Sequence, residues 1–512
     1  MARRSALREL TPDRVSQQLQ SIIQKMLLTE KKYASVLADI HPHFKTSGIN
    51  LLHYLVLRST ELRDIQEYLH REGLSSLTNS EGHTLHQLQK VLHWLNRSFS
   101  PEAPAVCTSE EGNRLRSLHS EHLLGTFPAH DRPHIMVTFS AELMQDRKLV
   151  EDMLNEGMTV ARINCAHDAP DVWLNMIRVL RSAVAKTGKN CKIYMDLAGP
   201  KIRIRAIQNK KRELVEQLEV EEGTELLLNY SEEDKVAGGK KKKRKLNTLY
   251  VEPREILTIV KPGEHIFFDD GKFEARVDAW EDGKVRVEIV RISTKKPFLK
   301  PQKGINLPDS DVTIPPLTDD DLANIPFICE HADMVGYSFV NSPSDVDKLR
   351  AELKRFSVQR EPDIILKIER LSAVRNLPAL LMNGMQNPGL GVMIARGDLA
   401  VEIGFERLSE IQEEILWICE AAHVPVIWAT QVLETLNKTG YATRSEITDA
   451  AMGVRAECVM LNKGQFIVKT IKTLDDILTR QLGHVDKKRF IMRPLGIAKG
   501  FTGMDRESAK AI

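Results

Sequence analysis

The stretch Ile364–Ile403 reads IILKIERLSAVRNLPALLMNGMQNPGLGVMIARGDLAVEI, and it decides how the rest of the chain is interpreted. Two short apolar runs, Ile364–Leu366 and Val392–Ala395, are separated by a segment long enough for a helix. Such runs predict buried parallel strands. Charged residues follow both runs: Lys367 and Glu369, then Arg396 and Asp398. The ends of parallel strands are where α/β proteins carry their chemistry.

Further apolar runs of the same kind occur on both sides of this stretch. The complete set is Ile135–Phe139, Thr159–Ile163, Cys191–Met195, Met334–Phe339, Ile364–Leu366, Val392–Ala395, Val424–Ala429 and Cys458–Leu461. Helix-like segments such as Asp171–Ala185 lie between most of them. Eight strands alternating with helices predict an α/β fold of the (β/α)8 TIM-barrel type.

The barrel pattern is interrupted once, and the residues before it follow a helical pattern instead. About 100 residues of β-type segments and turns follow the third run, which predicts a small inserted β-domain. The expected organisation is a helical bundle (1–97), a linker (98–130), an N-terminal barrel segment (131–203), the inserted lid domain (204–303), a C-terminal barrel segment (304–490) and a C-terminal tail (491–512).

Helical periodicity dominates the N-terminal bundle. Thr11 precedes Pro12 and Asp13, which predicts an N-cap with proline at the first helical position. Three amphipathic helices are expected, beginning near Val15, over Ile49–His70 and over Thr84–Leu95. The bundle is rich in histidine, including His41, His43, His53, His70, His83, His86 and His93. Solvated helix faces are favoured over a metal site, because the spacing of metal-ligand pairs is lacking.

Composition bounds the class of protein. The 512 residues imply two or three domains, and 28% charged residues with a net charge of +2 give no bias toward nucleic acid or membrane. Six scattered cysteines without a CxxC pair fit reduced, buried thiols in a cytoplasmic protein. No apolar run is long enough to cross a membrane, and no signal peptide is apparent. The run Lys240–Lys245 is interpreted as a solvated loop rather than a nucleic-acid patch.

Polar groups follow six of the predicted strands, at the rim where a barrel carries its functional residues. They are Arg162, Asn164, His167, Asp196, Lys201, Arg203, Ser338, Lys367, Glu369, Arg396, Asp398, Thr430, Gln431 and Glu434. Arginine and lysine suit phosphate or carboxylate groups, whereas Glu369 and Asp398 suit Mg2+. Zinc motifs and a P-loop are absent from the sequence. These residues predict Mg-dependent chemistry on a small phosphorylated or carboxylated metabolite, with Lys367 stabilising negative charge.

Eight motifs stand in order along the chain. They are VARINCAHD (Val160–Asp168), MDLAGPKIR (Met195–Arg203), FDDGKF (Phe268–Phe273), KGINLP (Lys303–Pro308), LKIER (Leu366–Arg370), MIARGDLAVEI (Met393–Ile403), IWATQVLE (Ile427–Glu434) and ATRSEITDAA (Ala442–Ala451). Together they resemble the pyruvate kinase family. The resemblance covers about residues 134–480. It implies phosphoryl transfer from phosphoenolpyruvate to ADP, giving pyruvate and ATP, as in the last step of glycolysis.

The resemblance also implies residue roles. Lys367 would contact the transferring phosphoryl group, Arg162 would bind its phosphate, and Thr430 would lie on the proton path. Glu369 and Asp398 would hold Mg2+, and the backbone at Gly397 would receive the substrate carboxylate. Nucleotide-side positions match Asn164, His167, Arg203 and Lys303, and K+ positions match Asn164 and Asp196.

Four departures from the family pattern modify these expectations. Ala166 replaces a serine that helps bind K+, and Lys201 resembles members that do not need K+, so no K+ requirement is expected. The eighth-strand motif is altered at Met460–Gln465, and the first-strand motif at Thr138–Ala141. The family's C-terminal regulatory domain is not expected, so sugar-phosphate regulation should be absent and any homo-oligomer should be built differently.

Two alternatives to an active pyruvate kinase remain open. One is a weak or inactive homologue that serves as a ligand-binding or regulatory protein, for which the altered Asn462–Gln465 loop is the motive. The other is a different Mg-dependent enzyme of phosphoenolpyruvate or pyruvate on the same barrel. Fold alone does not separate these alternatives.

Overall fold

The computed structural model describes residues 10–96, 106–126, 132–142, 146–230, 246–281, 283–310, 312, 314–357, 360–482, 484–486 and 489–490. The Lys240–Lys245 run and the C-terminal tail from 491 onward lie outside the described residues. The chain divides into two compact units, one formed by Met1–Arg162, Leu174–Ile193 and Leu416–Ile512, the other by Ile163–Trp173 and Tyr194–Ile415. Among the described helices, none is long and apolar enough to cross a membrane.

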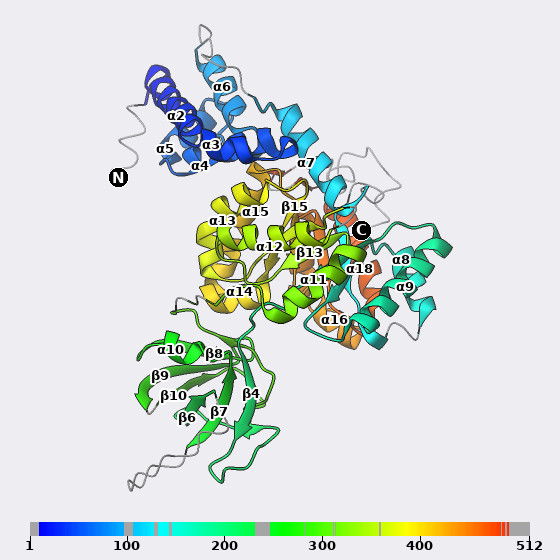
Figure 1. The fold of residues 1–512 in the computed structure, drawn as a ribbon. Helices are drawn as coiled ribbons and strands as arrows, with labels where there is room; N and C mark the ends of the chain where they lie inside the picture. The colour runs from blue at the N-terminus through cyan, green and yellow to red at the C-terminus, as the bar shows by residue number, and fades with distance from the viewer. Residues whose placement is uncertain are drawn as a thin grey trace, which may run out of the picture. The chain divides into compact units, whose positions relative to one another are not determined.

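Eight parallel strands close a barrel, which confirms the predicted fold class (Figure 1). The strands are β1 (His134–Thr138), β2 (Val160–Asn164), β3 (Lys192–Asp196), β13 (Met334–Tyr337), β14 (Asp363–Ile368), β15 (Leu390–Ala395), β16 (Val426–Ala429) and β17 (Cys458–Leu461). Their order around the barrel is β1-β17-β16-β15-β14-β13-β3-β2. Each coincides with one of the eight predicted apolar runs, because strands covered on both faces need continuous apolar sequence.

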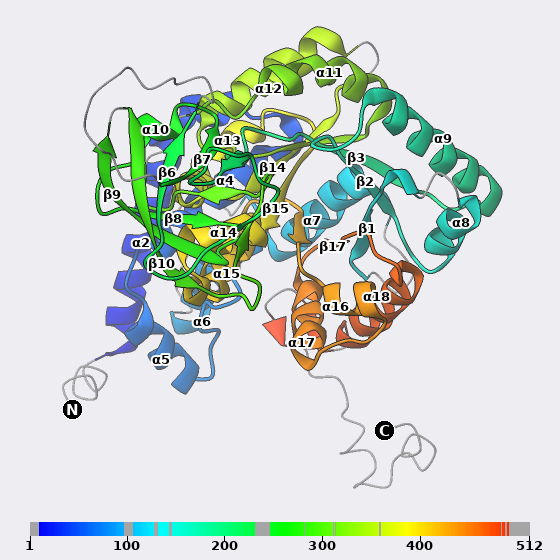
Figure 2. The ribbon, with the colours of Figure 1, turned by 90° about the horizontal axis from the view of Figure 1, so that it is seen from below.

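Helices separate the barrel strands along the chain. They are α8 (Arg147–Asn155), α9 (Pro170–Thr187), α11 (Asp319–His331), α12 (Pro343–Phe356), α13 (Leu371–Gly384), α14 (Arg396–Ile403), α15 (Leu408–Ala421), α16 (Glu434–Thr439), α17 (Arg444–Met452) and α18 (Ile467–Gln481). In the second unit α12 packs between α11 and α13 (Figure 2). The capping boxes Thr318–Asp321 and Ser342–Asp345 fix where α11 and α12 begin.

The inserted domain is a sheet with its own apolar core (Figure 1). Its elements are β4 (Arg203–Gln208), β5 (Leu218–Glu219), β6 (Glu225–Asn229), β7 (Asn247–Glu252), α10 (Ile256–Ile259), β8 (His265–Phe268), β9 (Phe273–Glu281), β10 (Lys284–Ile292), β11 (Phe298–Leu299) and β12 (Ile305–Asn306). Seven strands form one sheet in the order β12-β8-β9-β10-β6-β7-β4. The chain therefore enters the sheet at β4 and leaves it at β12.

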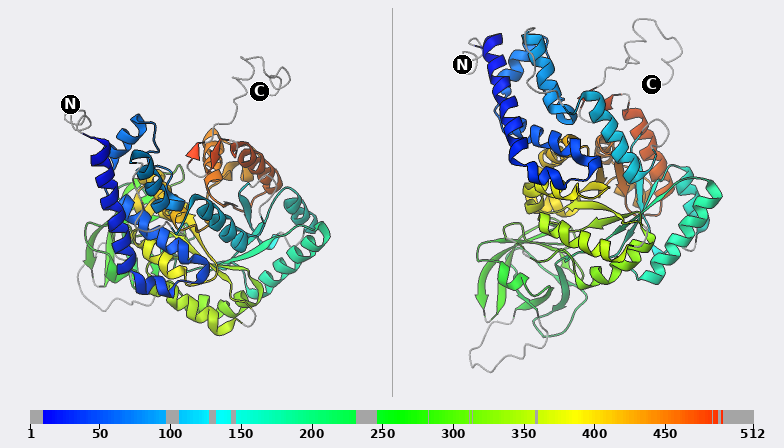
Figure 3. Two further views of the ribbon diagram at one scale, coloured as in Figure 1. Left: turned by 90° about the horizontal axis from the view of Figure 1, so that it is seen from above. Right: turned by 45° about the horizontal axis from the view of Figure 1, so that its top comes forward.

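The N-terminal region of the first unit is helical (Figure 3, blue). It contains α2 (Pro12–Lys32), α3 (Ala34–Asp39), η2 (Pro42–Phe44), α4 (Lys45–Arg58), α5 (Arg63–Arg71), η3 (Glu81–His83), α6 (Thr84–Leu95) and α7 (Ser109–Leu124). The predicted N-cap is confirmed, since the Thr11 side chain accepts a hydrogen bond from the Arg14 amide. Helix α7 lies within the stretch predicted as a linker.

Two expectations for this helical region were wrong. The single helix predicted over Ile49–His70 is broken into α4 and α5, because the Ser59 and Thr60 hydroxyls bond back to the Val56 carbonyl and compete with the helical pattern. Not all of the histidines are solvated either. His53 and His83 are buried, at 3% and 5% exposed, and their rings make hydrogen bonds inside the fold.

A buried polar junction joins these helices to the end of α15 within the first unit. Asn50, 1% exposed, donates to the carbonyls of Glu81 and Ala421 at 2.6 and 2.8 Å, and its own oxygen accepts from the Thr84 amide at 2.8 Å. One side chain thus satisfies three backbone groups from three elements. Buried backbone groups need such partners, so Asn50 holds α4, η3, α6 and α15 together.

His423, in the turn before β16, completes the junction. Its ring contacts the Gly82 carbonyl at 2.8 Å and the Ser47 hydroxyl at 3.1 Å, and its carbonyl contacts the His119 ring at 2.8 Å. Burial lowers the pKa of His423 to about 4, so the ring is neutral at pH 7. The N-terminal helices therefore pack on the barrel chain through matched polar groups rather than through apolar contacts alone.

Candidate functional site

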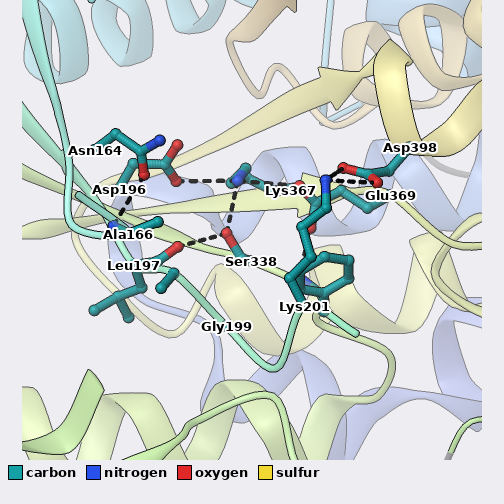
Figure 4. A network of polar contacts seen from close by, with 12 residues as sticks. Asn164, Ala166, Asp196, Leu197, Gly199, Lys201, Ser338, Lys367, Glu369 and Asp398 are labelled. Carbon is teal, nitrogen blue, oxygen red and sulfur yellow. Dashed lines mark hydrogen bonds and ion pairs between the residues drawn. The ribbon is translucent and has the colours of Figure 1, made fainter. Parts of the chain in front are cut away.

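Lys367 is the centre of a buried charge network in the second unit (Figure 4). It lies near the carboxyl end of β14, whose six residues are all buried. Its ammonium nitrogen lies 3.1 Å from Asp196 Oδ1 and 3.0 Å from Glu369 Oε1, and it donates to Ser338 Oγ at 2.6 Å. A buried ammonium is tolerated only with several such partners. The structure therefore brings together residues that the sequence predicted at the ends of three different strands.

Neighbouring groups hold the partners of Lys367 in place. Asp196, at the end of β3, accepts a hydrogen bond from the Tyr194 hydroxyl at 3.1 Å. Ser338 donates to the Leu197 carbonyl at 2.7 Å, so its hydroxyl lone pairs face the lysine (Figure 4). Asp196 and Ser338 are each held by a further hydrogen bond, so the position of the Lys367 ammonium is fixed before any ligand binds.

Glu369 follows β14 and is 3% exposed. One oxygen pairs with Lys367, and the other accepts from the Phe339 amide at 2.7 Å. Burial raises the pKa of Glu369, and the neighbouring Lys367 opposes that rise. The Phe339 amide therefore fixes the orientation of this carboxylate.

Asp398 lies in the first turn of α14, which begins directly after β15. Its two oxygens lie 3.1 and 3.2 Å from the Lys201 ammonium. Burial would raise the pKa of Asp398, but pairing with Lys201 outweighs it and lowers the pKa. The first turn of a helix also favours a negative charge. The Lys201 ammonium thus lies beside the Asp398 carboxylate (Figure 4).

Acids outnumber bases in this network as the structure describes it. The interacting acids are Asp196, Glu369, Asp398 and Glu402, and the bases are Lys201, Lys367 and Arg370. These carboxylates offer a cation several oxygen ligands. Among the described residues no three His, Cys, Asp or Glu side chains are assembled around one metal position. Mg2+ does not need such a cage, because it binds one or two carboxylates together with substrate oxygens and water.

One buried atom supports that fit. The side chain of Asn306 is next to Asp398, and its oxygen has no hydrogen-bond partner among the described residues. A buried unpaired oxygen costs free energy unless a donor or a cation binds there. Glu369, Asp398 and this oxygen are hard oxygen donors of the type that Mg2+ prefers.

The residues matched to the nucleotide side make their own contacts. Asn164, on β2, accepts a hydrogen bond from the Ala166 amide at 3.1 Å (Figure 4). The His167 backbone amide bonds to the Asn164 carbonyl at 3.1 Å. Lys303 pairs with Asp269 of the inserted domain at 2.9 Å rather than with the acids around Lys367. Arg203, the first residue of β4, donates to the Gln302 carbonyl at 3.4 Å.

Arg162 and Thr430 belong to the first unit. The Arg162 guanidinium donates to Thr138 Oγ1 at 3.0 Å. Thr430 follows β16 with a φ of 67°, a conformation that β-branched residues rarely adopt. Gln431 and Leu433 also have positive φ, at 58° and 47°. Strained backbone of this kind persists where the surrounding structure enforces it, often at functional sites.

Contacts within the first unit fix the conformation of the altered loop after β17. The Asn437 side chain donates to the Asn462 carbonyl at 2.6 Å. A Cβ at Gly464 would lie 2.5 Å from the Asn437 side chain, so glycine is required there. The loop that departs from the family pattern thus has a defined structure of its own.

Four residues of the site were not given a role from the sequence. Ser338 was expected at the rim without a role, and Asn306, Arg370 and Glu402 were not singled out. Asn306 and Arg370 lie inside the KGINLP and LKIER motifs, and Glu402 lies four residues after Asp398, on the same helix face. That helical spacing was the available signal for Glu402.

Fold and site together define an α/β-barrel protein with a buried lysine and carboxylates at the carboxyl ends of its strands. The family model "Pyruvate kinase, barrel domain" matches residues 131–471. Curated pyruvate kinases of Staphylococcus saprophyticus and Staphylococcus aureus are 30% and 29% identical to the chain, over 68% of its length. The chain belongs to the pyruvate kinase family. It spans 56% of the length of these relatives.

Proposed function

We propose that this protein transfers a phosphoryl group from phosphoenolpyruvate to ADP, giving pyruvate and ATP. Family membership and the buried Lys367 network support the proposal. In the reaction the bond between phosphorus and the enol oxygen breaks, and a bond to the terminal phosphate oxygen of ADP forms. The enolate then takes a proton at carbon, and pyruvate results.

The observation that carries the proposal is the fixed position of Lys367. Phosphoryl transfer depends on positioning and on neutralising the oxygens that gain negative charge. The Lys367 ammonium is held by Asp196, Glu369 and Ser338 before ligand binds, so it needs little reorganisation to meet such an oxygen. Asp196 and Glu369 orient it and balance its charge.

Other residues take the roles that the family pattern assigns. Glu369 and Asp398 hold Mg2+, which supplies charge neutralisation at the substrate oxygens. Arg162 binds the phosphate through its guanidinium, and Thr430 serves the proton transfer to the enolate carbon. The backbone amide at Gly397, in the first turn of α14, receives the substrate carboxylate.

On the nucleotide side, Asn164, His167, Arg203 and Lys303 contact ADP. A bound K+ at Asn164 and Asp196 is unnecessary, because the Lys201 ammonium supplies a positive charge beside Asp398. We place this activity in the cytoplasm, as a step of glycolysis.

The test is ATP formation from ADP and phosphoenolpyruvate with Mg2+, with and without K+. Wild-type protein should be active in both salts, and Lys367→Met should lose at least about 1000-fold in rate. Lys348→Met is the matched control, since that lysine is 60% exposed on α12 and should leave the rate unchanged. Equal activity of wild type and Lys367→Met would remove Lys367 from its role. A strong K+ requirement would contradict the role of Lys201.

A ligand-binding protein without turnover is the second candidate function. The observation in its favour is the locked Asn462–Gln465 loop, which lacks the family's serine and glutamate. In that case the protein would bind phosphoenolpyruvate and Mg2+ with measurable affinity and form no ATP. Calorimetric binding beside the turnover assay distinguishes the two.

A further inference from the structure

Asn306 is the last residue of β12, where the chain leaves the inserted domain. Its side-chain nitrogen lies 3.4 Å from Asp398 Oδ1 and 3.3 Å from Glu402 Oε1. These two acids are four residues apart on α14, so they share one helix face. A single amide from the inserted domain therefore bridges two successive turns of a barrel helix.

The orientation of this amide is set by its neighbours. Carboxylates accept hydrogen bonds and do not donate them, so the nitrogen must face the two acids. The amide oxygen is then directed elsewhere, and it has no hydrogen-bond partner among the described residues. The residue is 5% exposed, so bulk water does not compensate for the missing partner.

Glu402 is itself held in place. Burial raises its pKa, opposed by the nearby Arg370 guanidinium and by the hydrogen bond from Asn306. Arg370 is 6% exposed and lies over the Phe339 ring at 4.9 Å. The anchor of Asn306 is thus a packed, charge-balanced group rather than a mobile surface acid.

We propose that Asn306 is a positioning residue of the divalent-cation site, which holds Asp398 through its nitrogen and accepts a hydrogen bond from the cation's water shell through its oxygen. The inference rests on the function proposed above, because it takes Asp398 as a ligand of the cation. An amide that orients a ligating carboxylate typically contributes about 10- to 100-fold to metal affinity.

The position of Asn306 gives the proposal a second consequence. Lys201 precedes β4, where the chain enters the inserted domain, and Asn306 lies where it leaves. Both side chains contact Asp398. The two connections between the barrel and the inserted domain therefore both contact the Asp398 carboxylate. A cation bound at Asp398 would thus affect the conformation of both connections.

Binding of Mn2+, measured by electron paramagnetic resonance of the free ion, tests the proposal on the full chain without nucleotide. Asn306→Leu keeps the branched shape of the side chain and removes both polar atoms. We expect it to weaken Mn2+ binding by about tenfold or more. Asn247→Leu is the matched control: it is also a buried asparagine of the inserted domain, at 9% exposed, but its oxygen accepts from the Lys210 amide. It should change the affinity by less than about twofold.

Unchanged Mn2+ affinity in folded Asn306→Leu would overturn the inference, while ATP formation by the wild type would leave the proposed function standing. Absence of Mn2+ binding to the wild type at millimolar concentration would also overturn the inference, and the ATP assay described above would then decide the proposed function separately. If Asn306→Leu does not fold, a second pair decides. Glu402→Gln retains an oxygen that accepts from Asn306, whereas Glu402→Leu does not. Glu402→Leu should bind Mn2+ at least about threefold more weakly than Glu402→Gln, and equal affinities would contradict the proposal.

Discussion

Replacing Asn50 by leucine should loosen the attachment of the N-terminal helices to the end of α15. The substitution keeps the branched shape of the side chain and removes three hydrogen bonds, to the Glu81 and Ala421 carbonyls and from the Thr84 amide. The Thr84 amide loses its side-chain acceptor and becomes an unsatisfied buried donor, which costs about 1–3 kcal/mol. Each carbonyl adds about 0.5–1 kcal/mol, since a carbonyl has two lone pairs to satisfy.

The sum is a loss of about 3 kcal/mol, or about 100-fold in the opening equilibrium of these helices. Hydrogen exchange followed by mass spectrometry reads that quantity directly, as faster exchange in peptides from α4 and α6 under native conditions. Asn376→Leu is the matched control, because Asn376 is exposed and donates to the Asn341 carbonyl at 2.7 Å. Equal exchange in Asn50→Leu and the control would refute the idea that the junction depends on this amide.

Two further predictions concern acid sensitivity and the Lys367 network. The pKa of His423 is about 4 in the folded chain, because of burial, against 6.5 when exposed, so the unfolded chain binds the extra proton first as pH falls. The part of the folding free energy that depends on the neutral His423 ring, up to about 3 kcal/mol, is fully present above pH 6.5 and is lost between pH 6.5 and 4. Arg116 and the rings of His119 and His83 also lower this pKa. Urea midpoints at pH 7.5 and 5 should therefore differ less in His423→Gln than in wild type, and an identical pH dependence would contradict this. Gly336→Ala should reduce turnover by about 100-fold, because a Cβ there would lie 1.9 Å from the Tyr194 hydroxyl and 2.6 Å from Asp196 Oδ1. Normal turnover in folded Gly336→Ala would show that Asp196 does not need its present position.

The barrel was predictable because its signal is local. Strands such as β14 and β15 are continuous apolar runs that end in charge, and a parallel sheet covered on both faces requires that pattern. The break between α4 and α5 was not predictable from periodicity, since it depends on where the Ser59 and Thr60 hydroxyls bond. The apolar residues keep a helical spacing across the break, so the sequence pattern is the same for one long helix as for two short ones.

Part of the charge network was predictable from the sequence, but the pairing of its residues was not. The apolar runs placed Lys367, Glu369 and Asp196 at strand ends, and strand order then brings them together. They did not reveal that Lys201 reaches Asp398 rather than solvent, or that Lys303 pairs with Asp269. A lysine side chain has several rotamers and can pair with more than one nearby acid. Which acid it pairs with depends on the packing around it rather than on its position in the chain.

The junction at Asn50 and His423 makes the barrel segment depend on residues that precede it. The segment that matches the family model begins at residue 131, yet the Ala421 carbonyl and the His423 ring have partners that lie before it. Deleting the residues before 131 would therefore remove these partners and expose the Ala421 carbonyl and the His423 ring. A barrel segment cut at residue 131 is therefore expected to be less stable than the same segment with the N-terminal helices attached.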